Sequence, residues 1–199
     1  WSSDVCSSDL RTYSHKAFLA LCRKTGGISA PDTLLLYLHN AGIVFYLQGV
    51  FADRIVLDQQ WALDAVYAVF DRDAAVPLLA GTDGWFRREH LAATVWRGRP
   101  IEDQRQFLSM MVECGMCFVA HRDWENEDSA HYVAPDLLPE RQAIETQLRA
   151  RWETSEPVLT HGFAFPLLHR GIVRSVMAEL GGQAGIAGTY WRDGLYLYD

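Results

Sequence analysis

A long stretch without a charged side chain, Leu34 to Ala52, constrains the fold of this chain most. Its nineteen residues contain no Asp, Glu, Lys or Arg, and a helix of that length can span a bilayer. However, His39-Asn40-Ala41-Gly42 in its middle is typical of a helix end, and the β-branched and aromatic residues 43–46 favour a strand. Because a helix broken there would leave backbone groups unpaired in lipid, we predict a helix, then a strand, and no membrane insertion.

The composition predicts an ordered protein that is not built to bind nucleic acid. Hydrophobic residues make up 49% of the 199 residues, which is too much for a disordered chain. The formal net charge is −7, so the chain lacks the basic surplus that binds a phosphate backbone. Its four cysteines are too few for a disulfide-stapled secreted scaffold, and we therefore expect a reducing, cytoplasmic setting.

The first ten residues differ from the rest of the chain. Ser-Ser-Asp occurs twice within them, and they lack the basic start and apolar run of a signal peptide. They resemble the translated adapter sequence that contaminates some assembled genes. We therefore treat residues 1–10 as a non-native segment and exclude them from the fold prediction.

Hydrophobic periodicity and turn residues predict the elements that follow. In chain order they are helices over 14–24 and 32–41, strands over 43–47 and 54–57 joined through Gly49, a helix over 60–70 capped by Asp58, and a loop over 71–83. Next come an extended piece at 84–86, helices over 88–97 and 100–113, and strands over 116–120 and 131–134. Helix, helix and β-hairpin is the element order of a winged helix.

The remaining residues predict a second, smaller unit. An amphipathic helix over 139–152 precedes a strand over 158–165, a helix over 171–180 stopped by Gly181-Gly182, and a hairpin over 188–198 that turns at Arg192-Asp193-Gly194. The predicted class is α+β. It comprises a helical first lobe that contains a winged-helix-like unit, followed by the start of a smaller mixed α/β second lobe.

Motifs for catalysis and nucleotide binding are absent from the sequence. Neither Lys16 nor Lys24 has the glycine spacing of a Walker A loop, which needs G-x-x-x-x-G-K-[ST] to wrap phosphates. The sequence also lacks G-x-S-x-G, H-E-x-x-H and G-x-G-x-x-G. We therefore predict no catalytic residue, no nucleotide-binding residue and no cofactor.

A Cys-x-x-Cys motif at 114–117 raises the question of metal or redox chemistry. A redox thiolate needs a helix N-terminus, whereas this pair is predicted at a helix C-terminus. A zinc site could use Cys114, Cys117, His121 and His131, but structural zinc sites usually pair two such motifs. Core packing of the cysteines is therefore favoured over these weak candidate metal ligands. The acidic run 123–128 predicts a solvated hairpin tip.

The winged-helix order also suggests DNA binding as an alternative function. The second helix of that unit would then present basic side chains to the groove. It carries Glu102, Asp103, Gln104, Arg105 and Glu113, which is a net acidic set. Because phosphates would repel this helix, we do not expect a nucleic-acid partner.

Several stretches between residues 14 and 199 are informative when taken together. They are Leu36-Tyr37-Leu38-His39-Asn40-Ala41-Gly42-Ile43-Val44-Phe45, Ile55-Val56-Leu57-Asp58-Gln59-Gln60-Trp61-Ala62, Tyr132-Val133-Ala134-Pro135-Asp136-Leu137-Leu138-Pro139, Phe163-Ala164-Phe165-Pro166 and Tyr190-Trp191-Arg192-Asp193-Gly194. In this order and spacing they resemble the COR (C-terminal of Roc) domain of Roco proteins. Gln59 stands where that family usually has a proline, which makes the entry into the following helix less rigid.

The resemblance implies a fold, a partner and a role. Residues 11–153 would form the first COR half, and residues 154–199 the beginning of an incomplete second half. The family uses COR to dimerise and to couple the nucleotide state of an adjacent Roc GTPase to the rest of the protein. This implies Ile55, Val56, Leu57 and Trp61 as candidate Roc contacts, with core packing as the alternative, and Phe165, Leu167, Leu168 and Val173 as candidate self-association residues.

Overall fold

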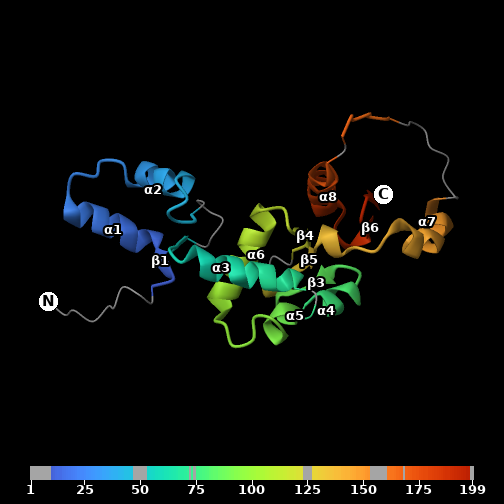
Figure 1. Ribbon diagram of the computed structural model, residues 1–199, viewed down its shortest axis with the longest axis horizontal. Helices are drawn as coiled ribbons and strands as arrows, with labels where there is room; N and C mark the ends of the chain where they lie inside the picture. Colours follow the sequence, from blue (N-terminus) through green and yellow to red (C-terminus); the bar gives the residue numbers. More distant parts are fainter. Residues whose placement is uncertain are drawn as a thin grey trace.

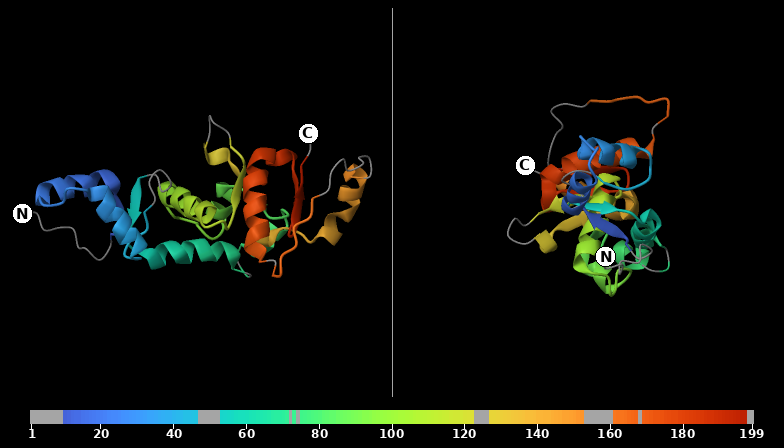
Figure 2. Two further views of the ribbon diagram at one scale, coloured as in Figure 1. Left: turned by 90° about the horizontal axis from the view of Figure 1, so that it is seen from above. Right: turned by 90° about the vertical axis from the view of Figure 1, so that its left-hand side faces the viewer.

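The structure of the protein is a computed structural model that describes residues 10–46, 53–71, 73, 75–122, 127–152, 161–167 and 169–197. Its helices and short antiparallel strands form an elongated α+β arrangement, which confirms the predicted class (Figures 1 and 2). Helices α1 (His15–Thr25) and α2 (Pro31–Asn40) lie at one end and α7 (Glu145–Trp152) at the other, with a three-stranded sheet between them.

The uncharged stretch begins inside a helix, and this helix ends close to the residue that the sequence predicted. Helix α2 ends at Asn40, and Gly42 follows with a φ of +69°, a conformation that glycine adopts without steric cost. The chain then leaves the helix direction, and Phe45 bridges to Val56. In the part of the chain that the structure describes, no helix has the length and apolarity needed to cross a bilayer.

The strand partner in the N-terminal unit differs from the prediction. Strand β2 (Arg54–Val56) pairs antiparallel with β1 (Thr12–Ser14), whereas the two strands predicted here were 43–47 and 54–57, joined through Gly49. Within residues 43–46, Phe45 contributes an isolated bridge, and residues 47–52, including Gly49, lie outside the described part. The prediction missed β1 because three residues are too few for an alternating pattern to be recognised.

Side-chain caps start two helices at the predicted residues. The Ala17 backbone N–H donates to Ser14 Oγ at 3.0 Å, and the Trp61 backbone N–H donates to Asp58 Oδ1 at 3.0 Å. Each such cap typically stabilises a helix by about 1 kcal/mol. Asp58 thereby fixes the start of α3 (Gln59–Tyr67), which ends in the 3₁₀ turn Ala68–Phe70.

The segment predicted as a loop over 71–83 contains a short helix. Helix α4 (Val76–Ala80) begins with a proline in its first turn and inserts Leu79, which is fully buried, into the main core. Proline at that position suits a helix start because its missing N–H would have no helical acceptor. The prediction of a loop was therefore wrong, because the free energy gained by burying one leucine outweighs the effect of the helix-breaking residues around it.

The central unit has the predicted order of strand, two helices and hairpin. Its elements are β3 (Trp85–Phe86), α5 (Arg88–Ala93), α6 (Ile101–Glu113), β4 (Phe118–His121) and β5 (His131–Val133). Strand β5 lies between β3 and β4 in one antiparallel sheet. Helix α5 is shorter than predicted, because residues 94–98 form turns that end at Gly98 with a φ of +76°.

The largest core joins α3 and α6 to this sheet. Phe107 of α6 packs between two indoles, with ring centroids 4.9 Å from Trp61 and 5.5 Å from Trp96. Trp96 is fully buried, and its indole N–H donates to the Ala65 carbonyl at 2.8 Å. Phe107, Leu108 and Met111 point inward as the helical spacing predicted.

The C-terminal part differs from the prediction in three places. The helix predicted over 139–152 is a 3₁₀ turn, Arg141–Ile144, followed by α7. The residues 161–165 that the structure describes within the predicted strand 158–165 are exposed and form no strand. Helix α8 (Arg170–Ala184) continues through Gly181-Gly182 and is followed by Gly185, so the predicted stop was also wrong.

The glycine pair inside α8 has a packing role, which the sequence prediction missed because glycine usually ends a helix. A Cβ atom at Gly181 would lie 2.5 Å from Phe118 Cε2, so glycine allows α8 to approach β4 closely. Met177 and Tyr190 complete an apolar cluster with Phe118 and Val133 of the sheet. The predicted hairpin is present as β6 (Thr189–Trp191) and β7 (Gly194–Tyr196). Elements on both sides of the predicted boundary at 153/154 thus share one apolar cluster, and the boundary stays a prediction.

Candidate interaction surfaces

The four candidate Roc contacts occupy two different environments. Ile55 packs with Leu35 in the core of the N-terminal unit, while Val56 and Trp61 pack in the main core. All three side chains are buried, as the core-packing alternative required. Leu57 differs from them, because its side chain is 40% exposed at the end of β2. A partner surface could therefore reach Leu57 directly, and the other three only through their surroundings.

Two arginines far apart in the sequence meet at Trp61. The guanidinium carbon of Arg11 lies 5.6 Å from the centroid of the Trp61 ring, and that of Arg99 lies 6.0 Å from it. The Arg11 carbonyl also accepts the backbone N–H of Leu57 at 2.9 Å, which brings the exposed leucine to the same place. We call this surface, formed by Arg11, Leu57, Trp61 and Arg99, the Trp61 corner.

The candidate self-association residues lie on and before α8. Phe165 is 49% exposed and Leu167 is 81% exposed, whereas Val173 packs partly against the cluster around Phe118. Leu168 lies outside the described residues. Phe163 alternates with Phe165 and Leu167 and is exposed as well. An uncovered row of large apolar side chains of this kind is typical of a surface that another element or molecule covers.

The two cysteines of the Cys-x-x-Cys motif lie in different environments. Cys114 is exposed, whereas Cys117 is buried in the main core, and burial raises the pKa of the Cys117 thiol far above its usual value. A thiol in this environment remains protonated and packs as a small hydrophobe. Within the described ranges, no three His, Cys, Asp or Glu side chains lie close enough together to hold a metal ion.

The two candidate histidines face each other across β4 and β5, but one is already engaged. His121 and His131 are register partners with ring centroids 5.9 Å apart. Arg87 Nε donates to His131 Nε2 at 2.9 Å, which occupies the lone pair that a metal would need. Burial, followed by the positive charge of Arg87, lowers the pKa of His131. The imidazole is thereby held neutral against an arginine.

Asp128 corrects the prediction of a fully solvated acidic tip. Its Oδ1 accepts from Arg88 Nε at 3.1 Å, and its two oxygens accept from Arg105 Nε and Nη2 at 3.1 and 3.0 Å. These hydrogen bonds, above all those from Arg105, lower the pKa of the Asp128 carboxyl. Asp128 therefore clamps the hairpin to α5 and α6. Residues 123–126 of the same acidic run lie outside the described part.

A comparison with family models identifies the larger part of the chain. The family model described as "C-terminal of Roc, COR-A domain" matches residues 4–138. The chain belongs to the COR-A family. No curated protein is similar enough to count as a match. COR-A domains belong to Roco proteins, in which they follow a Roc domain, and are not themselves catalytic.

The matched residues of the COR-A domain cover both cores of the first lobe. They run from within the segment predicted as non-native, residues 1–10, to Leu138, just after β5. All four candidate Roc contacts lie inside the match, and the candidate self-association residues lie beyond it. The arginines of the Trp61 corner were not found from the sequence, because 88 positions separate Arg11 from Arg99 and no spacing rule links them.

Proposed function

We propose that this chain is a non-catalytic coupling module of a Roco GTPase. It binds the Roc domain of the same parent chain and passes the nucleotide state of Roc on to the rest of the protein, with the cytoplasm as its setting. The match of residues 4–138 to the COR-A family carries this proposal. The lack of any phosphate-binding motif supports a role in which the chain responds to a nucleotide bound elsewhere.

The proposed mechanism is differential docking. A Roc domain that binds COR-A more tightly in one nucleotide state than in the other shifts COR-A between two arrangements by that difference in affinity. The exposed side chain of Leu57 supports a contact at the Trp61 corner, because a half-exposed leucine beside arginines offers apolar area together with charge.

Calorimetry with the Roc domain encoded by the same gene tests this proposal. The Roc domain is loaded with GDP or with a non-hydrolysable GTP analogue and titrated into the 199-residue chain. We expect the two dissociation constants to differ at least threefold, whereas equal constants would exclude coupling at this interface. Titrating the nucleotide alone should give no binding, and micromolar affinity would contradict the proposal.

A matched pair of leucines locates the contact. Leu57→Ser should weaken Roc binding about tenfold, because the interface loses a buried leucine side chain. Leu78→Ser on α4 is the control, because Leu78 is 38% exposed and lies outside the Trp61 corner. Equal affinities of the two variants would place the Roc contact elsewhere on the chain.

Self-association is the second part of the proposal. The exposed side chains of Phe165 and Leu167 support it, since water-exposed apolar rows favour association. Light scattering of the chain at increasing concentration should give a rising mass that Phe165→Ser with Leu167→Ser abolishes. Tyr37→Ser, at an exposed position of α2, should leave the mass unchanged. A concentration-independent monomer would contradict this part alone.

DNA binding remains the alternative, and the charges of α6 oppose it. Glu102 and Glu113 are exposed on that helix, and the Arg105 guanidinium is bound to Asp128. A helix with these side chains releases few counterions from a phosphate backbone. A gel shift at low salt should therefore show no tight complex, and tight binding would favour the winged-helix alternative.

A further inference from the structure

We propose that the Trp61 corner is a binding site for carboxylate groups on the surface of a protein partner. The inference rests on the proposed function for the identity of that partner, the Roc domain. It adds which chemistry the partner presents: acidic side chains that meet Arg11 and Arg99.

Two positive charges converge at the Trp61 ring. The Arg11 and Arg99 guanidinium carbons lie 5.6 and 6.0 Å from the same Trp61 ring, and Arg99 also lies 5.5 Å from the Phe107 ring. Neither guanidinium forms an ion pair with a carboxylate of the described residues. An aromatic face holds a guanidinium in place and leaves its planar N–H fork available for a carboxylate.

Several other arginines of the described residues form ion pairs with acids. Examples from different surfaces are Arg54 with Asp103 at 2.9 Å, Arg192 with Glu140 at 2.6 Å and Arg174 with Asp136. The sequence holds 25 acidic and 18 basic residues, so acids are plentiful. Arg11 and Arg99 have no such partner among the described residues although they meet at one ring, which supports an acceptor from a partner molecule.

Two acids of the described residues near this corner have other partners. Asp58 Oδ1 accepts the Trp61 backbone N–H and caps α3, and Asp103 at the start of α6 binds Arg54. The indole N–H of Trp61 is itself buried and has no acceptor within the described residues, whereas that of Trp96 donates to a backbone carbonyl. Unpaired buried donors are uncommon, and this one lies at the same corner as the two unpaired cations.

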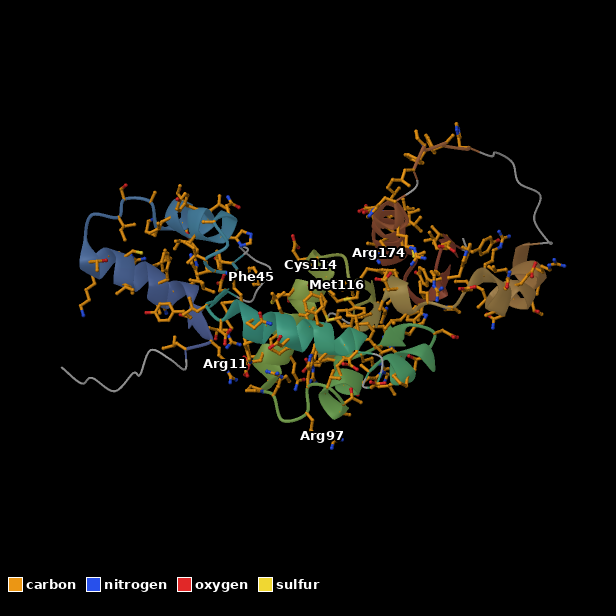
Figure 3. All side chains as sticks on the ribbon, in the orientation of Figure 1. Arg11, Phe45, Arg97, Cys114, Met116 and Arg174 are labelled. Carbon is orange, nitrogen blue, oxygen red and sulfur yellow. The ribbon has the colours of Figure 1, made fainter. Side chains whose placement is uncertain are left out.

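The surroundings favour a protein surface over a free anion. Leu57 adds exposed apolar area next to Arg11, and tryptophan, arginine and apolar side chains are the typical composition of protein interfaces. A free inorganic anion would gain nothing from Leu57. Figure 3 shows Arg11 at the lower edge of the molecule, with its side chain outside the packed elements.

Nuclear magnetic resonance of the ¹⁵N-labelled chain tests the proposal. The probe is a blocked hexaglutamate peptide, titrated at constant ionic strength while the indole N–H signal of Trp61 is followed. This signal is assigned with Trp61→Phe. We expect it to shift on addition of hexaglutamate and to remain in place with blocked hexalysine. The double variant Arg11→Gln, Arg99→Gln should weaken hexaglutamate binding at least tenfold.

The matched control is Arg23→Gln, which removes an exposed arginine of α1 that makes no cation–π contact within the described structure. It should bind hexaglutamate as the unaltered chain does. Unchanged binding by the double variant, or equal weakening by the control, would overturn the site. Sodium sulfate that binds more tightly than hexaglutamate and displaces it would overturn the assignment to carboxylates. Circular dichroism confirms that each variant is folded.

The same double variant separates this inference from the proposed function. If Roc binds the double variant as tightly as the unaltered chain, the carboxylate site fails as a Roc contact while coupling stands. If hexaglutamate binding depends on the two arginines but Roc does not bind at all, the site stands and the proposed Roc partner fails.

Discussion

Alanine substitution at Gly181 tests whether close packing or helix propensity dominates in α8. A Cβ atom at this position would lie 2.5 and 2.7 Å from two ring atoms of Phe118 and 3.1 Å from Tyr190 Cε1. Both rings are buried and cannot withdraw into solvent. At the adjacent Gly182 the nearest atom to a new Cβ is the Val119 carbonyl oxygen at 3.8 Å, an ordinary contact distance.

Gly181→Ala and Gly182→Ala therefore gain the same free energy from helix propensity, but they differ in the free energy lost to steric overlap. Alanine in place of glycine inside a helix gains about 1 kcal/mol. Overpacking a core typically costs about 1–3 kcal/mol. We expect Gly181→Ala to destabilise the chain by up to about 2 kcal/mol and Gly182→Ala to stabilise it by up to about 1 kcal/mol. Their difference, about 1–3 kcal/mol, measures the packing cost alone.

Urea unfolding followed by far-ultraviolet circular dichroism measures both free energies of unfolding. A thermal scan should show the same order, since about 1 kcal/mol corresponds to roughly 2–4 °C in a domain of this size. If Gly181→Ala proves as stable as Gly182→Ala, the close approach of α8 to β4 is wrong. The contact between the C-terminal helix and the sheet would then have to be reconsidered.

Three further predictions concern the polar groups of the main unit. Asp128→Asn should lower the free energy of unfolding at neutral pH by about 1 kcal/mol, because two arginine partners lose a charged acceptor; urea titration measures this, and no loss would contradict the clamp. Because the folded pKa of His131 is lowered, stability is full above the unfolded pKa near 6.5 and falls as pH drops below it; unfolding at several pH values should show this slope, and His131→Gln should flatten it. Trp96→Phe should cost about 1–3 kcal/mol more than Trp61→Phe, since only the Trp96 indole loses a hydrogen bond within the described structure; equal losses in urea titrations would contradict the assignment.

Local sequence signals were enough for the elements whose ends depend on neighbouring residues. Ser14 and Asp58 start helices because their side chains accept an N–H three residues later, and that interaction needs no tertiary partner. The inward face of α6 followed from helical spacing, and the Asp-Gly turn between β6 and β7 followed from the turn residues. The resemblance to the COR domain likewise rested on short motifs in a fixed order, and the family match confirms it over residues 4–138.

The tertiary structure alone decided what depends on distant partners. Strand β1 forms because β2 lies beside it. Position 181 inside α8 is a glycine because the Phe118 ring occupies the space that a side chain would need. The meeting of Arg11 with Arg99 belongs to the same class, since each is linked to the other only through Trp61. Capping and periodicity act within one or two helical turns and can be seen along the chain. Sheet pairing, close packing and convergence of charge join residues that only the folded chain brings together.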